Sequence, residues 1–213
     1  MVGIAIGAVL FLAALVALGL QPSAEERLQR ALARLPVSPI GTVAREGLVR
    51  VRGRLRLLGE PLTAPLSGRP CAVYQITAYE DSDEGGPRQV AHEVQGCDFL
   101  VGDGTGHAQV RFAAGSYAIQ QDFHVRSFAG HGGSAAVHEL LARHLTNLPG
   151  NHRLRIVEGV LAEGERVDVA GVGRWRSVAE DDFAGYRDAP RRLFLEAPAK
   201  GRILVSDQVE EER

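Results

Sequence analysis

The chain has 213 residues, 45% of them hydrophobic, and a formal net charge of −2. A charge so close to zero gives no overall basic field, so we do not expect nucleic acid to be the partner. Two cysteines, Cys71 and Cys97, are too few for a disulfide framework or a four-thiolate zinc site. They could pair with each other in an oxidising compartment, or be one buried core thiol and one incidental thiol.

The N-terminal segment carries no charged side chain from Met1 to Ala24, and residues 2–20 are almost continuously apolar. A helix over these 19 residues would be about 28 Å long, which matches the ~30 Å hydrocarbon core of a bilayer. We therefore predict a transmembrane anchor over residues 1–22, with the lipid bilayer as a partner. A cleaved signal peptide is the alternative, but no Lys or Arg precedes the apolar run.

A short helix is predicted after the anchor. Ser23 can cap it, Glu26 occupies the capping-box position, and apolar residues follow at helical spacing as far as Pro36. With the linker behind it, this helix makes a juxtamembrane segment over residues 23–40. The arginines that follow the apolar segment predict a cytoplasmic C-terminal domain on a single-pass protein, in what we expect to be a bacterial plasma membrane. They are Arg27, Arg30 and Arg34.

The pattern changes to a period of two beyond Gly41. Apolar residues alternate with four arginines, Arg50, Arg52, Arg54 and Arg56. Alternate residues of a strand face opposite sides, so one face is predicted to be apolar and the other basic. A turn-rich connection over 61–70, a strand over 71–79 and an exposed acidic loop over 81–89 follow.

The second half of the chain predicts further short strands. Residues 98–101 and 108–112 flank Asp103-Gly104, a hairpin signal. An amphipathic helix is predicted over 135–148, then strands near 153–161, 166–170 and 203–205. The fold class is mainly β (α+β), as a small OB-like barrel or curled sheet with one amphipathic helix, over residues 41–206. An acidic tail over 207–213 ends the chain.

The candidate catalytic and metal motifs are weak. The histidines at 124, 131, 138 and 144 lie within 21 residues, and His138-Glu139 is similar to the start of a zinc-protease helix. The next histidine follows six positions later, a rotation of about 240°, so His138 and His144 cannot share the helix face that zinc ligands need. We therefore expect no metal, no cofactor and no catalytic residue. An unrecognised hydrolase that uses these histidines is the enzymatic alternative.

The four arginines of the predicted strand are the candidate binding residues. Near a membrane they could contact anionic lipid headgroups, each contributing on the order of 1 kcal/mol. An oligonucleotide is a second ligand, although the chain has few aromatic residues for base stacking. The simplest alternative is a solvated strand face balanced by acids such as Glu80 and Asp81.

Four segments in a fixed order resemble the GIDE-type domain, also called the beside-a-membrane domain. The resemblance extends over about residues 41–206. The segments are Gly47–Gly53; Ala64–Gly68 with Cys71 and Tyr74; Phe99–Val101 with Asp103, Thr105 and Gly106; and Leu161 with 163–165 and 167–171. The motif residues that we expect to serve the fold are Gly53, Pro65, Leu66, Ser67, Gly68, Cys71, Tyr74, Asp103, Gly106, Gly164 and Gly171.

The resemblance implies a membrane-adjacent domain that binds a partner. Eukaryotic members of this family are mitochondrial outer-membrane E3 ubiquitin ligases, whose activity resides in a C-terminal RING finger. The two cysteines here cannot supply the RING zinc ligands. We therefore expect a membrane-anchored, non-catalytic binding or scaffold module with an unknown protein partner. A component of ubiquitin transfer is the alternative that the family implies.

Overall fold

The computed structural model describes residues 23–81, 86–112, 115–128, 153–177 and 191–208, with the single positions Ala135, Glu139, Ala142 and Arg143. Among these residues, no helix combines the length and apolarity needed to cross a bilayer. The predicted anchor over 1–22, most of the predicted helix over 135–148 and residues 209–213 of the predicted tail lie outside the described part.

The described fold is mainly β, with the helix α2 (Ala24–Ala33) and the 3₁₀ turn η1 (Ile40–Thr42) preceding the strands. In the first half of the chain the strands are β1 (Gly47–Leu57), β2 (Leu62–Thr63), β3 (Pro70–Cys71), β4 (Val73–Glu80), β5 (Arg88–Gly96), β6 (Phe99–Gly102) and β7 (His107–Val110). In the second half they are β8 (Ser116–Ala118), β9 (Phe123–Phe128), β10 (Arg153–Leu161), β11 (Arg166–Ser177), β12 (Arg191–Glu196) and β13 (Leu204–Ser206).

Five strands close into a mixed barrel. Neighbouring strands follow the order β1-β6-β7-β12-β11, and β11 pairs back with β1. Every pairing in the barrel is antiparallel except that between β7 and β12. The prediction of a mainly β fold is therefore confirmed, and closure into a barrel is the form that the structure adopts. The barrel interior holds the main core, which includes Val51, Leu55, Phe99 and Leu195.

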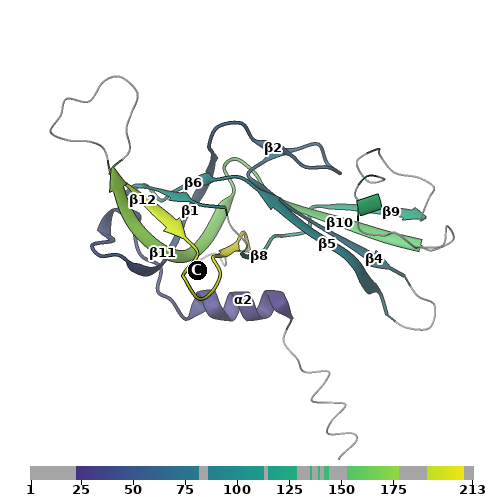
Figure 1. The fold of residues 1–213 in the computed structure, drawn as a ribbon, viewed down its shortest axis with the longest axis horizontal. Helices are drawn as coiled ribbons and strands as arrows, with labels where there is room; N and C mark the ends of the chain where they lie inside the picture. Colours follow the sequence, from purple (N-terminus) through teal and green to yellow (C-terminus); the bar gives the residue numbers. More distant parts are fainter. Residues whose placement is uncertain are drawn as a thin grey trace, which may run out of the picture.

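A second, four-stranded sheet stands beside the barrel, in the order β5-β4-β10-β9. Figure 1 shows it extending away from the barrel, with α2 lying across the underside of the molecule. The sheet draws β4 and β5 from the connection between β1 and β6, and β9 and β10 from the connection between β7 and β11. Its own smaller core includes Ile76, Leu154 and Ile156.

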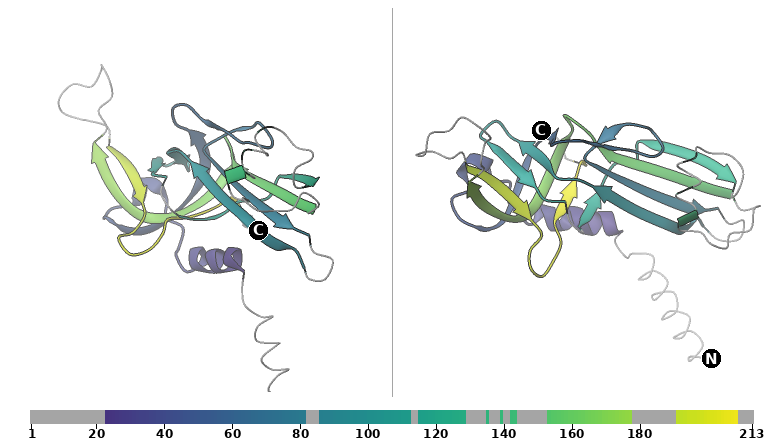
Figure 2. Two further views of the ribbon diagram at one scale, coloured as in Figure 1. Left: turned by 45° about the vertical axis from the view of Figure 1, so that its right-hand side comes forward. Right: turned by 45° about the horizontal axis from the view of Figure 1, so that its top comes forward.

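Helix α2 begins and ends close to where the sequence predicts. The Ser23 hydroxyl accepts a hydrogen bond from the Glu26 amide at 3.0 Å, so the predicted cap is confirmed. Leu28 and Leu32 are buried against Ala118 of β8 and Ala170 of β11. Figure 2 shows from two further sides that the helix lies against the barrel. The apolar stripe of α2 thus packs on the domain.

Candidate functional site

Strand β1 confirms the predicted alternation, but its four arginines differ in how far their side chains are exposed. Val51 and Leu55 are fully buried in the barrel. On the opposite face, Arg54 and Arg56 are exposed, whereas the side chains of Arg50 and Arg52 are only 12% exposed. The first pair along the chain, Arg50 and Arg52, lies next to α2, whose Gln29 lines the same cavity as these two arginines. The four residues therefore do not form one continuous solvated basic face.

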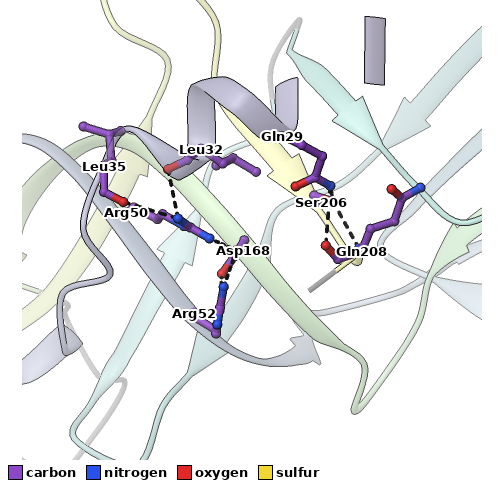
Figure 3. Close-up of polar contacts among 8 residues, drawn as sticks. All are labelled: Gln29, Leu32, Leu35, Arg50, Arg52, Asp168, Ser206 and Gln208. Carbon is purple, nitrogen blue, oxygen red and sulfur yellow. Dashed lines mark hydrogen bonds and ion pairs between the residues drawn. The ribbon is translucent and has the colours of Figure 1, made fainter. Parts of the chain in front are cut away.

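A single carboxylate holds the first pair. Asp168 lies opposite Arg52 in the pairing of β1 with β11, and its side chain is 3% exposed. Arg52 donates from Nε to Oδ1 at 2.7 Å and from Nη2 to Oδ2 at 3.0 Å. Arg50 donates to Oδ2 from Nη2. Two guanidinium groups thus share one buried carboxylate (Figure 3).

The same cluster fastens the end of α2. Nη1 of Arg50 donates to the carbonyl oxygen of Leu32, in the last turn of the helix, at 2.9 Å and to that of Leu35, just beyond the helix, at 3.3 Å. A cation at this end also suits the negative pole of the helix. One turn earlier, Gln29 donates to Ser206 Oγ at 2.7 Å (Figure 3). Polar and apolar contacts together therefore fix α2 against β1, β11 and β13.

The pKa of Asp168 reflects these contacts. Burial by itself would raise the pKa, but hydrogen bonds from Arg52 and Arg50, and their charges, hold it below the ordinary value. A carboxyl with a lowered folded-state pKa stabilises the fold above its unfolded pKa of about 3.9. That stabilisation is lost as pH falls through the lower folded-state value, so Asp168 contributes to stability at neutral pH.

A cavity of about 630 Å³ opens beside this cluster, between α2 and the barrel. Its wall includes Arg52, Asp168, Gln29, Gln120 and Asp207. The size is within the range of small-molecule sites. However, the charged groups of Arg50, Arg52 and Asp168 already bind one another and the helix end. The arrangement accordingly serves α2 docking first.

The carboxyl group of Asp207 lies in the wall of this cavity and changes its charge with pH. Burial raises the pKa of Asp207 to about 6, although the Gln120 amide donates to its carboxylate at 2.9 Å. A raised folded-state pKa means that the folded protein binds more protons than the unfolded chain between about pH 4 and 6. The free energy of unfolding should therefore fall through this window as pH rises.

We expect Asp207→Asn to remove that fall, because an amide does not ionise and can still accept the hydrogen bond from Gln120. Urea unfolding at several pH values from 4 to 7 measures the difference between the native chain and the variant. The difference in unfolding free energy should grow in favour of the variant up to about pH 6 and then level off. A constant difference at every pH would contradict this role of Asp207.

The loop that precedes β3 is held by a buried carboxylate. Glu158 of β10 is 1% exposed and accepts hydrogen bonds from the amides of Leu66 at 2.7 Å and Ser67 at 3.0 Å. Half-buried Pro65 directly precedes these two amides. Gly68 follows with φ of 70°, a conformation that favours glycine. These predicted motif residues therefore serve the path of the loop, and sequence reasoning did not identify Glu158.

The turn between β6 and β7 is organised by Asp103. Its carboxylate accepts hydrogen bonds from three backbone amides, those of Ile40, Thr105 and Gly106, at 2.7, 2.8 and 3.1 Å. These bonds hold the pKa of Asp103 below its usual value, although burial alone would raise it. Asp103 and Gly106 thus tie the hairpin to η1. The predicted hairpin is confirmed.

The other motif residues also lie at structural positions. Gly164 turns the chain between β10 and β11 with φ of 84°, and a Cβ at Gly171 would lie 2.8 Å from the Glu196 carbonyl oxygen. Cys71 is buried, Tyr74 packs partly buried against it, and burial raises the pKa of the Cys71 thiol to about 11. Cys71 and Cys97 are both free thiols. The structure therefore shows no disulfide between them.

The predicted histidine cluster is only partly described. His124 lies exposed on β9, and the histidines at 131, 138 and 144 lie outside the described residues. Within the described part of the chain, no group of three or more His, Cys, Asp or Glu side chains is placed to hold a metal ion.

Comparisons with known proteins add no relative. The chain matches no family model, no curated protein and no solved structure. The resemblance of its ordered segments to the GIDE-type domain therefore stays a prediction from the sequence.

Proposed function

We propose that this chain is a membrane-tethered, non-catalytic binding module of the GIDE type, with a barrel of the OB type. Numbered along the chain, the barrel strands are neighbours in the order first, second, third, fifth, fourth, and the fourth closes on the first. The third and fifth strands, β7 and β12, are parallel. This order and direction support a barrel of the OB type, a fold that binds oligonucleotides and oligosaccharides in other proteins.

The docking of α2 is the observation that carries the proposal. The helix starts directly after the segment predicted to span the membrane, and its ten residues extend about 15 Å. The helix is fixed to the barrel by buried leucines and by hydrogen bonds of Gln29 and Arg50. Ser23, at the start of the helix, therefore has a set position on the domain. An anchor that leaves the domain at Ser23 would hold the barrel close to the bilayer surface.

Three carboxylates that are engaged within the fold support a binding role rather than a catalytic one. Asp168 binds two arginines, Glu158 binds two loop amides, and Asp103 binds the β6–β7 turn. Each of these groups is engaged in holding the fold. Catalytic acids and bases would instead have to reach a reacting group.

Membrane extraction tests the tether. We expect the full chain to remain in the membrane fraction after alkaline carbonate treatment, because carbonate removes peripheral proteins but not spanning helices. A variant with Leu12→Lys and Leu15→Lys should be released, since each lysine near the bilayer centre disfavours insertion by about 3 kcal/mol. Release of the native chain by carbonate would overturn the tether.

Protease added to sealed right-side-out membrane vesicles tests the orientation in the same preparation. We expect the domain to be protected, as the flanking arginines predict a cytoplasmic position. Cleavage of the domain without permeabilisation would place it on the outer side.

A further inference from the structure

The exposed arginine pair of β1 lies where the strand changes partner. Up to Arg54, β1 pairs with β11, and from Arg54 to Leu57 it pairs with β6. Arg54 and Arg56 project from this second part, on the same face, and both are exposed. They differ from Arg50 and Arg52, whose guanidinium groups are engaged by Asp168 beneath α2.

The two side chains line a hollow of about 600 Å³. The other walls are the β6–β7 turn, the ring of His107, and the turn at Glu163 and Gly164. Arg54 donates from Nη1 to the Gly164 carbonyl oxygen at 2.9 Å, which positions its guanidinium at the edge of the hollow. Within the described part of the chain, no ion pair with an acidic side chain is found for Arg54 or Arg56.

The charge and the walls of the hollow suit an anion. Two guanidinium groups face one carboxylate, that of Glu163, which accepts a hydrogen bond from the Leu57 amide. Two wall residues, Gly104 and Gly164, have no atom within 4 Å of the place where a Cβ would lie, so a ligand can approach the backbone closely there. A guanidinium matches the oxygens of a phosphate group with paired hydrogen bonds.

We propose that this hollow is a binding site for a phosphate-bearing anion, held by Arg54 and Arg56. The proposal gives the module of the preceding section a ligand class and rests on its binding role, but not on its tether. The phosphate can belong to a soluble compound or to a lipid headgroup, and the chemistry of recognition is the same.

Titration with inorganic pyrophosphate tests the site. The full chain is kept in neutral detergent micelles and in a phosphate-free buffer, and binding is measured by calorimetry. We expect saturable binding that Arg54→Gln with Arg56→Gln weakens at least about tenfold, because charge-assisted hydrogen bonds to the anion are lost. Arg54→Lys with Arg56→Lys should retain part of the affinity, since lysine keeps the charge but not the paired geometry.

A second arginine pair provides a matched control. Arg174 and Arg176 lie two positions apart on β11, with side chains 49% and 43% exposed, and both pair with Glu196. Changing both to Gln removes the same charge from the barrel as the test variant does. We expect this control to leave pyrophosphate affinity within about twofold, apart from weak long-range effects.

Two results would overturn the proposal. One is an absence of saturable pyrophosphate binding. The other is equal binding by the native chain and by the Arg54→Gln, Arg56→Gln variant, provided that the variant melts at the native temperature.

Phosphatidylglycerol added to the micelles shows whether the phosphate belongs to a lipid headgroup or to a soluble compound. Competition with pyrophosphate that depends on Arg54 and Arg56 indicates a headgroup, and unchanged affinity indicates a soluble phosphate. Because pyrophosphate needs no membrane, its binding and the carbonate test can fail independently.

Discussion

Asp168→Asn should lower the free energy of unfolding by about 3–5 kcal/mol. The substitution keeps the shape of the side chain but removes the carboxylate charge that Arg50 and Arg52 share, and the side chains of both arginines are only 12% exposed. Chemical denaturation near neutral pH measures the loss. Hydrogen exchange should show that protection falls first in α2, because Arg50 also holds the carbonyl ends of that helix.

An exposed ion pair is the control for this prediction. Glu26 and Arg30 lie one turn apart on α2 with side chains 59% and 65% exposed, so Glu26→Gln should change stability by no more than about 0.5 kcal/mol. Arg52→Gln should also be much less damaging in the Asp168→Asn background than in the native chain, since the shared partner is already gone. Additive losses would contradict the shared cluster.

Gly53→Ala should destabilise the barrel by about 1–3 kcal/mol, the usual penalty for forcing an additional methyl group into a packed site. A Cβ at this position would lie 2.4 Å from the carbonyl oxygen of Gly102 and 2.9 Å from a methyl carbon of Val101. The first contact is with backbone, so a change of side-chain rotamer cannot relieve it. Thermal unfolding measures the loss as a lowered melting temperature.

The same strand offers a matched control. A Cβ at Gly47 meets no atom within 4 Å, so Gly47→Ala should change stability by no more than about 0.5 kcal/mol. Gly53 immediately precedes the position at which β1 moves from β11 to β6, where the barrel turns and two backbones approach closely. Equal stability of the two variants would contradict the prediction, because it would mean that β1 and β6 move apart with no loss of stability.

A local sequence pattern is enough to predict some of the helices, strands and turns. Alternation identifies β1, because one face of the strand is buried in the barrel. Asp103 and Gly104 identify the β6–β7 hairpin, and Ser23 identifies the start of α2. In each case the residues that form the sequence pattern also make the hydrogen bonds or core contacts that stabilise the element.

Some strands carry no such signal. The sequence predicts a loop over 81–89, yet β5 begins at Arg88 and pairs with β4 along its length, so that end of the predicted loop is wrong. β5 is an edge strand with many exposed polar positions, and its pairing depends on backbone hydrogen bonds that any side chain permits. The sequence likewise does not predict β8, which pairs with β13 near the other end of the chain, or β9 and β12, which pair with the neighbouring strands β10 and β11.

The four arginines of β1 show which properties follow from the local sequence and which depend on the packing of distant strands. The sequence is enough to place four arginines on one face of β1, because the period of a strand is a local property. The packing of distant strands determines that Arg50 and Arg52 are bound within the fold while Arg54 and Arg56 remain exposed. The reason is that Asp168, 118 positions away from Arg50, lies opposite the first pair when β11 closes the barrel against β1.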